Sequence, residues 1–260
     1  PLYSSAASDV YKRQLLIFAA ALSAGTSSRA GEDGKTTDPS GTRAAEGMRT
    51  LEEIGISLDR ARMLPRDERE ETLGKAAVSL EEILDSGLPK ERRFAALFLA
   101  AEIDFALGRY GRAGQRYSEA AGKDREEVYR DDASAARIMA LEAEGRDGEA
   151  AKEWKKWFGK YPDSPLMPEA ILACSWNSLR RGMNEEAAAG LDRLVSAWPW
   201  MESDRRVILA RSVIVYIGGE YAAALGALDQ LDDSPTVAYL RALCHEALGE
   251  TLKAAASFQE

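Results

Sequence analysis

Small and bulky hydrophobic residues recur along the chain at fixed distances from a series of glycines. From Gly108 a glycine follows every 37 residues as far as Gly219, and one more follows 30 residues later. An alanine lies five residues after each glycine, and a bulky residue such as Tyr117 or Trp154 lies four residues further on. The recurring positions are Gly108, Tyr110, Ala113, Tyr117, Ala120, Gly145, Ala150, Gly182, Ala187, Gly219, Ala224, Gly249 and Ala254.

These spacings predict a pair of helices in each unit. Offsets of three and four place residues on one face of an α-helix, so a helix is expected shortly after each glycine. Glycine lacks a Cβ atom and can end the preceding helix in a left-handed conformation at little cost. Pro162, Pro199 and Pro235 then prevent the second helix from continuing. Each pair is too small to fold alone, and stacked neighbours would bury a continuous core.

An atypical unit precedes the first clear one. Ala76, Leu80 and Ile83 fall on the alanine and bulky positions, but Glu71 replaces the glycine. End repeats commonly depart from the pattern of interior repeats. We therefore interpret residues 45–93 as an atypical N-terminal helical hairpin and residues 94–260 as repeats, the last of them cut short.

The stretches ALGRYGRAGQRYSEA (106–120) and EGRDGEAAKEWKKWFGKYPDSP (144–165) resemble the tetratricopeptide repeat family. The resemblance extends over about residues 66–260 and implies an all-α fold, a right-handed α-solenoid of stacked helix–turn–helix repeats. The period of 37 residues exceeds the usual length of about 34, which implies longer helices or linkers. The segments KYPDSPLMPEA and SAWPWMESD resemble the joints of exported bacterial members of the family.

In this family the first helix of each repeat lines a concave groove. Carried over by register, the resemblance implies a partner groove that is apolar and aromatic with a few charges, suited to a peptide or a partner helix. Its positions are Phe98, Glu102, Phe105, Met139, Trp176, Arg180, Arg206, Tyr216 and Tyr239. The alternative is that this row packs inside a tight superhelix, and the sequence leaves both interpretations open.

The N-terminal part differs from the repeats. Residues 1–14 resemble translated sequencing-adapter sequence and are interpreted as a non-native tail, and residues 15–30 are typical of a secretory signal peptide. The apolar run is shorter than the roughly 20 residues that span a bilayer. The polar residues 31–44 predict a disordered linker. Gly25 stands where a bacterial lipoprotein needs cysteine, so we expect a soluble periplasmic protein that is not lipidated and has no transmembrane anchor.

Charge and chemistry exclude several classes of function. The formal net charge is −9 and no long lysine or arginine run occurs, which argues against nucleic acid as a partner. One histidine, His245, and two cysteines, Cys174 and Cys244, are too few for a structural zinc site. The cysteines lie two repeats apart, about 20 Å by the stacking distance, so both are expected to stay free. We find no candidate catalytic, cofactor-binding or metal residues and expect no cofactor.

The sequence therefore favours a non-catalytic exported scaffold or adaptor that binds a protein or peptide partner in the bacterial cell envelope. The alternative is the N-terminal superhelical part of a soluble lytic transglycosylase-like peptidoglycan enzyme, whose catalytic glutamate would follow residue 260. His245, Trp154 and Trp157 are expected to pack in the core. Trp198 and Trp200, beside Pro199, are also expected to pack rather than to stack on a glycan.

Overall fold

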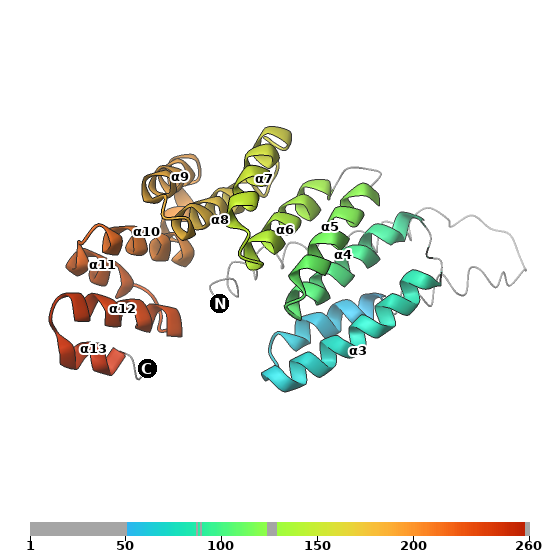
Figure 1. Ribbon diagram of the computed structural model, residues 1–260, viewed down its shortest axis with the longest axis horizontal. Helices are drawn as coiled ribbons and strands as arrows, with labels where there is room; N and C mark the ends of the chain where they lie inside the picture. Colours follow the sequence, from blue (N-terminus) through green and yellow to red (C-terminus); the bar gives the residue numbers. More distant parts are fainter. Residues whose placement is uncertain (1–50, 87, 89, 124–128, 258–260) are drawn as a thin grey trace, which may run out of the picture. The chain divides into compact units, whose positions relative to one another are not determined.

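The computed structural model describes residues 51–86, 88, 90–123 and 129–257. The predicted tail, signal peptide and linker therefore lie outside the described residues. Every regular element of the described ranges is helical, so the predicted all-α fold of paired, stacked helices is confirmed. The helices that follow a first helix over residues 51–61 are α3 (Arg66–Asp85), α4 (Lys90–Ala106), α5 (Tyr110–Lys123), α6 (Arg130–Ala143), α7 (Asp147–Lys160), α8 (Met167–Arg180), α9 (Asn184–Ala197), the 3-10 helix η1 (Pro199–Ser203), α10 (Arg205–Ile217), α11 (Tyr221–Leu228), α12 (Pro235–Ala247) and α13 (Thr251–Ser257) (Figure 1).

The described helices fall into two compact units. The N-terminal unit ends at Ser164 and contains the helices up to α7, and the C-terminal unit begins at Pro165 and contains α8 to α13. This division lies inside the span that the sequence pattern assigns to the repeats. In each unit the two helices of a repeat pack against each other, as α4 does with α5 and α8 with α9.

The same turn joins the two helices of each repeat. All five repeat glycines have a positive φ, between 72° at Gly108 and 85° at Gly219. At the first turn, the backbone N–H of Gly108 donates to the carbonyl of Phe105, and the N–H of Arg109 donates to the carbonyl of Asp104. This is the Schellman pattern of a helix end, and it requires the left-handed conformation that glycine adopts most readily.

The recurring alanines and bulky residues form the core. Ala113, Ala150, Ala187 and Ala224 are fully buried. In the N-terminal unit Ala113 and Tyr117 pack with residues of α4 and α6, including Phe98 and Ala136. The small alanines let neighbouring helices approach closely while the large side chains fill the space beside them. The small and bulky positions of the sequence thus reappear as packed side chains in the core of each unit.

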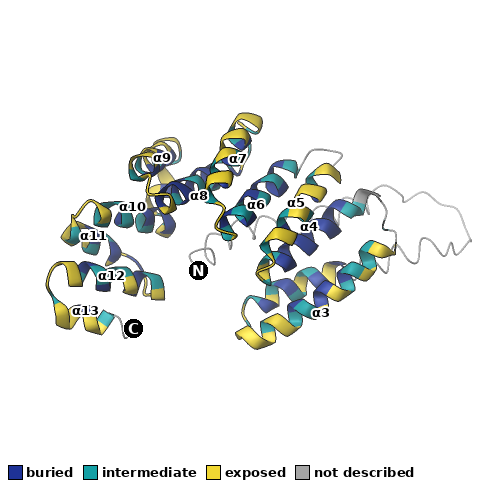
Figure 2. Cartoon of the chain, in the orientation of Figure 1, coloured by how far each residue is buried: buried dark blue, intermediate teal, exposed yellow. Residues whose placement is uncertain are grey.

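Helix α4 is enclosed on almost every side. All residues from Phe94 to Asp104 are buried, and Figure 2 shows the buried colour along most of this helix. One group of its side chains packs against the helix over 51–61 and α3, and another packs against α5 and α6. The atypical N-terminal hairpin therefore covers the first clear repeat.

Asp104 links α4 to α5 through a cluster of ion pairs around its buried carboxylate. Its carboxylate is fully buried and lies 2.8 Å from Nη1 of Arg116 and 3.6 Å from Nη1 of Arg109. Arg112 binds the same carboxylate through Nε, at 2.8 Å, and through Nη2. Arg116 also pairs with Glu81 of α3, so the cluster joins three helices.

Replacing Asp104 with asparagine is expected to lower the free energy of unfolding by about 2 kcal/mol, because three guanidinium groups lose their shared counter-ion. The loss stays below that of a fully buried pair since Arg109 and Arg112 are half exposed and can bind water instead. Urea unfolding followed by circular dichroism measures it. Asp85→Asn, at the exposed end of α3, is the matched control. Equal unfolding midpoints for the two variants would contradict a stabilising role for the cluster.

Candidate partner-binding surface

Three residues of the predicted groove, Phe98, Glu102 and Arg206, are buried in the structure and are not open to a partner there. Phe98 lies in the core, where its ring meets that of Tyr117 edge-on with the centroids 5.3 Å apart. Arg206 is held by Asp204, whose carboxylate oxygens lie 2.9 Å and 2.7 Å from its guanidinium nitrogens. Asp204 also accepts the backbone N–H of Arg206 and so caps the start of α10.

The third, Glu102, is a buried carboxylate with a perturbed pKa. The hydroxyl of Tyr117 donates a hydrogen bond to its Oε1 atom. Burial raises the pKa of Glu102 to about 8, against the opposing effects of the Tyr117 hydrogen bond and the positive charge of Arg62. A carboxyl group in this environment is held by the core and is not presented to a partner.

Two further groove residues lie in the N-terminal unit and are partly accessible. The ring of Phe105 meets that of Tyr110 edge-on, with the centroids 5.1 Å apart, and both residues are half-buried. Met139 is half-buried on α6. Phe105 and Met139 therefore contribute isolated apolar contacts and do not form a continuous surface with the buried Phe98 and Glu102.

The remaining groove residues belong to the C-terminal unit, where large side chains are exposed. Tyr239 on α12 is 54% exposed and Ile217 at the end of α10 is 50% exposed. Trp176 on α8 and Tyr216 on α10 are half-buried, and Arg180 is exposed at the end of α8. We call Trp176, Tyr216, Ile217 and Tyr239 the aromatic surface.

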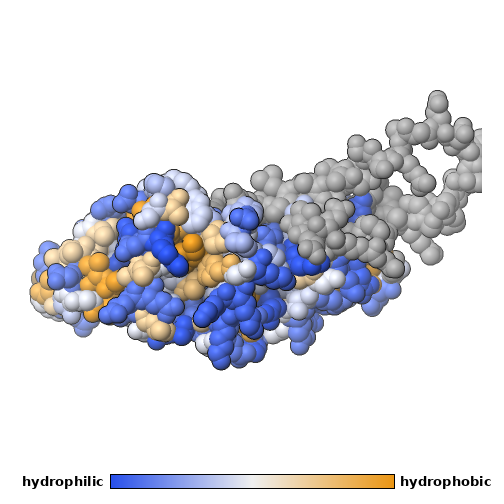
Figure 3. Space-filling view, turned by 90° about the horizontal axis from the view of Figure 1, so that it is seen from above, coloured by the Kyte–Doolittle hydropathy of each residue, from blue (hydrophilic) through white to orange (hydrophobic). Residues whose placement is uncertain are grey.

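The aromatic surface spans the first helices of successive repeats. Helix α10 packs against both α8 and α12. The phenol of Tyr216 lies near that of Tyr221, with ring centroids 5.4 Å apart, and near enough to Tyr239 for their charges to interact. Burial is the largest cause of the raised pKa of Tyr216. Hydrophobic residues show at the surface over the C-terminal helices, at the left of Figure 3.

Sequence reasoning missed Ile217 and the half-buried Val213. Val213 lies six residues before Gly219, the position that Trp176 holds relative to Gly182. Because equal repeat positions fall on the same face of successive first helices, the register itself identifies Val213. The repeat register does not identify Ile217. Its side chain is exposed because Ile217 is the last residue of α10, directly before the C-cap Gly218.

The side chains of possible chemical interest are held in structural contacts. His245 is largely buried, as expected, and its Nδ1 also lies 2.6 Å from Oε2 of Glu250 across the last repeat turn. Cys174 on α8 and Cys244 on α12 are not joined by a disulfide. Among the described residues, no three His, Cys, Asp or Glu side chains are grouped so as to hold a metal ion.

The tryptophans differ in how far they are buried. Trp154 and Trp157 are buried, as the repeat pattern predicts. Trp200, in η1, is 60% exposed, so the prediction that it packs is wrong. The short 3-10 turn after Pro199 directs Met201 into the core and leaves Trp200 outside. In the part of the chain that the structure describes, no helix combines the length and apolar character needed to cross a membrane.

Neither a family model nor a curated protein matches the sequence. Among solved structures, a tetratricopeptide repeat protein from Parabacteroides merdae ATCC 43184 is similar, with a TM-score of 0.60 and 18% identity over 79% of this chain and 76% of that chain. A structure described as MamA AMB-1 matches with a TM-score of 0.43 and 15% identity, over 64% of this chain and 88% of that chain. The first similarity, at this identity, is one of fold.

Proposed function

We propose that this chain, which has the fold of tetratricopeptide repeat proteins, is a non-catalytic scaffold that binds a protein or peptide through its C-terminal unit. The exposure of Tyr239 and Ile217, together with the partial exposure of Trp176 and Tyr216 on neighbouring first helices, supports this proposal most strongly. Large apolar side chains grouped at a surface commonly mark interaction sites, and Tyr and Trp supply much of the binding energy at such sites.

The proposed ligand is an apolar or aromatic segment of a partner, in a helical or extended conformation. Such a segment can bury the rings of Tyr216 and Tyr239 while the phenol hydroxyls still bond to water or to polar groups at its edge. Arg180, exposed at the end of α8, adds a positive charge beside this surface. The side chains of the aromatic surface include no nucleophile paired with a general base. We therefore propose binding without catalysis.

We further propose that the scaffold is exported and works in the bacterial cell envelope. The supporting observation is the apolar run 15–25, followed by small residues and a polar segment, in the order of a secretory signal peptide. Gly25, in place of the cysteine of a lipoprotein, supports an unlipidated form. Fractionation of bacteria that express the chain with its own leader tests this. Retention of the protein in the cytoplasm would contradict export.

The double substitution of Tyr216 and Tyr239 by alanine is expected to weaken binding of a selected peptide ligand at least tenfold. Each ring would lose a binding contribution of about 1–2 kcal/mol. Peptides are selected from a displayed library against the wild-type protein, and their dissociation constants are then measured by isothermal titration calorimetry.

Leu252→Ala is the control, because Leu252 is exposed on α13 outside the aromatic surface. Unchanged circular dichroism of the double variant shows that its fold is retained. Peptides that bind both variants as tightly as the wild type would show that the aromatic surface is not the binding site.

A further inference from the structure

A positively charged pocket lies over α6 and α7 in the N-terminal unit. It has a volume of about 610 Å³ and is lined by Arg137 and Leu141 of α6, by Arg146 at the turn, and by Glu149, Lys152, Glu153, Lys155 and Lys156 of α7. Five of these side chains are cationic and two are anionic. The pocket is therefore locally positive in a chain whose formal net charge is −9.

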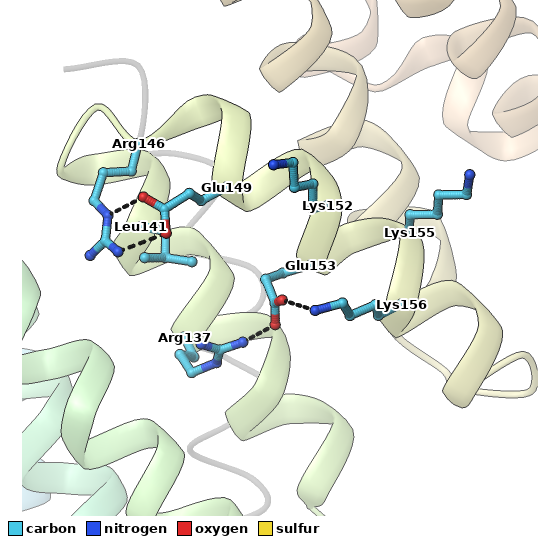
Figure 4. Close-up of a pocket in the computed structure, with 8 residues that line it drawn as sticks. All are labelled: Arg137, Leu141, Arg146, Glu149, Lys152, Glu153, Lys155 and Lys156. Carbon is cyan, nitrogen blue, oxygen red and sulfur yellow. Dashed lines mark hydrogen bonds and ion pairs between the residues drawn. The ribbon is translucent and has the colours of Figure 1, made fainter.

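The two carboxylates of the pocket are already neutralised by its own arginines and one lysine. Glu149 accepts hydrogen bonds from Nε and Nη2 of Arg146, at 2.9 Å and 2.8 Å. Glu153 binds Arg137 and accepts a hydrogen bond from Nζ of Lys156 at 2.6 Å (Figure 4). These pairings hold the pKa values of both carboxyls below their ordinary range, so both are ionised at neutral pH.

Lys152 and Lys155 remain available to a ligand. Both are exposed, and among the described residues neither forms an ion pair, although Lys152 lies close enough to Glu149 to lower its pKa. Positions 152, 155 and 156 follow helical spacing, so these three lysines lie on one side of α7. Leu141 adds an apolar contact at the α6 wall of the pocket.

We propose that this pocket binds an acidic peptide segment of a partner protein, with its carboxylates at Lys152 and Lys155 and an apolar residue against Leu141. The interleaved Glu149 and Glu153 favour a ligand with spaced single charges, because a continuous polyphosphate would place negative charge against them. The pocket belongs to the N-terminal unit and the aromatic surface to the C-terminal unit, and the ligand chemistry of the pocket is independent of that surface.

Three single substitutions on the same helix test the proposal. Lys152→Glu, Lys155→Glu and Lys160→Glu make the same change in net charge, but Lys160 lies outside the pocket, over the ring of Tyr161. The probe is a fluorescein-labelled peptide of alternating glutamate and leucine. Its binding to the full chain is measured by anisotropy at low and physiological salt.

The first two variants are expected to bind the probe about fivefold more weakly at low salt, because each loses an attraction and gains a repulsion, whereas Lys160→Glu changes binding less than about twofold. Added salt is expected to reduce the difference. The Tyr216→Ala, Tyr239→Ala double variant is expected to bind like the wild type, which separates this site from the aromatic surface. Equal losses in all three lysine variants, or tighter binding of a single-stranded oligonucleotide than of the peptide, would overturn the proposal.

Discussion

Replacing Trp154 with alanine is expected to lower the free energy of unfolding by about 3–5 kcal/mol, the cost of removing a large ring from a closed core. Its side chain is 1% exposed. The ring packs edge-on against Trp157 and stacks on Phe158, with centroid distances of 5.9 Å and 6.1 Å. Its indole N–H also donates to Oε1 of Glu142, which is buried and would be left without this donor.

Urea unfolding followed by circular dichroism measures this loss. Trp200→Ala is the matched control, since the same side chain is removed from an exposed position and the expected change is below about 0.5 kcal/mol. Trp154→Phe keeps most of the packing but lacks the N–H donor, so its expected loss is intermediate. Similar unfolding curves for Trp154→Ala and Trp200→Ala would show that the bulky repeat position contributes little to the core.

Glu102→Gln is expected to make the protein more stable than the wild type above pH 8, by on the order of 5 kcal/mol. Burial raises the pKa of Glu102 from 4.5 to about 8 in the folded state. Between these two values the folded wild type binds a proton that the unfolded chain does not, so its stability falls by about 1.4 kcal/mol for each unit of increasing pH. Glutamine cannot ionise and can still accept the hydrogen bond from Tyr117.

The measurement is the difference in unfolding free energy between the two proteins from pH 4.5 to 8.5. Taking the difference cancels the titration of groups that both proteins share. This difference in unfolding free energy is expected to be small near pH 4.5 and to grow as the pH rises. Glu82→Gln, which removes an exposed carboxylate from α3, controls for the change in net charge. A constant difference across the range would show that Glu102 ionises as readily as in the unfolded chain.

The repeat and its helices can be predicted from the sequence because their requirements are local. The turn needs a residue that adopts positive φ, and Gly108 meets that need within its own unit. Close packing needs a small residue, and Ala113 is fully buried, so that a larger side chain there would overpack the core. Spacings of three and four then determine the buried face of α5.

The partner-binding surface is less predictable because register gives the direction of a side chain but not what covers it. Phe98 lies at a groove position, yet the atypical N-terminal hairpin and α5 enclose α4 from both sides. The equivalent helix in the C-terminal unit, α12, leaves Tyr239 exposed. Which first helices remain open depends on packing between distant segments, and no local pattern encodes it.

The charged pocket was missed for another reason. Lys152, Lys155 and Lys156 are visible in the sequence as a cationic face of one helix, but such faces are usually solvated surface. The distinguishing feature is the pairing of Glu153 with Arg137, which lies on α6 and is sixteen residues away in the chain. That pairing forms only when α6 packs against α7. The sequence therefore shows the charged residues but not which of them are neutralised by a partner.

The five left-handed glycine turns have a consequence for how a chain of this kind changes length. Each turn is closed by hydrogen bonds between the last residues of one helix and the two that follow, as at Gly182, where Met183 donates to Ser178. Nothing in that geometry depends on a second unit. A helical pair can therefore be duplicated or deleted without any change to the turn that joins its two helices. What such a change must preserve is the packing between neighbouring helical pairs.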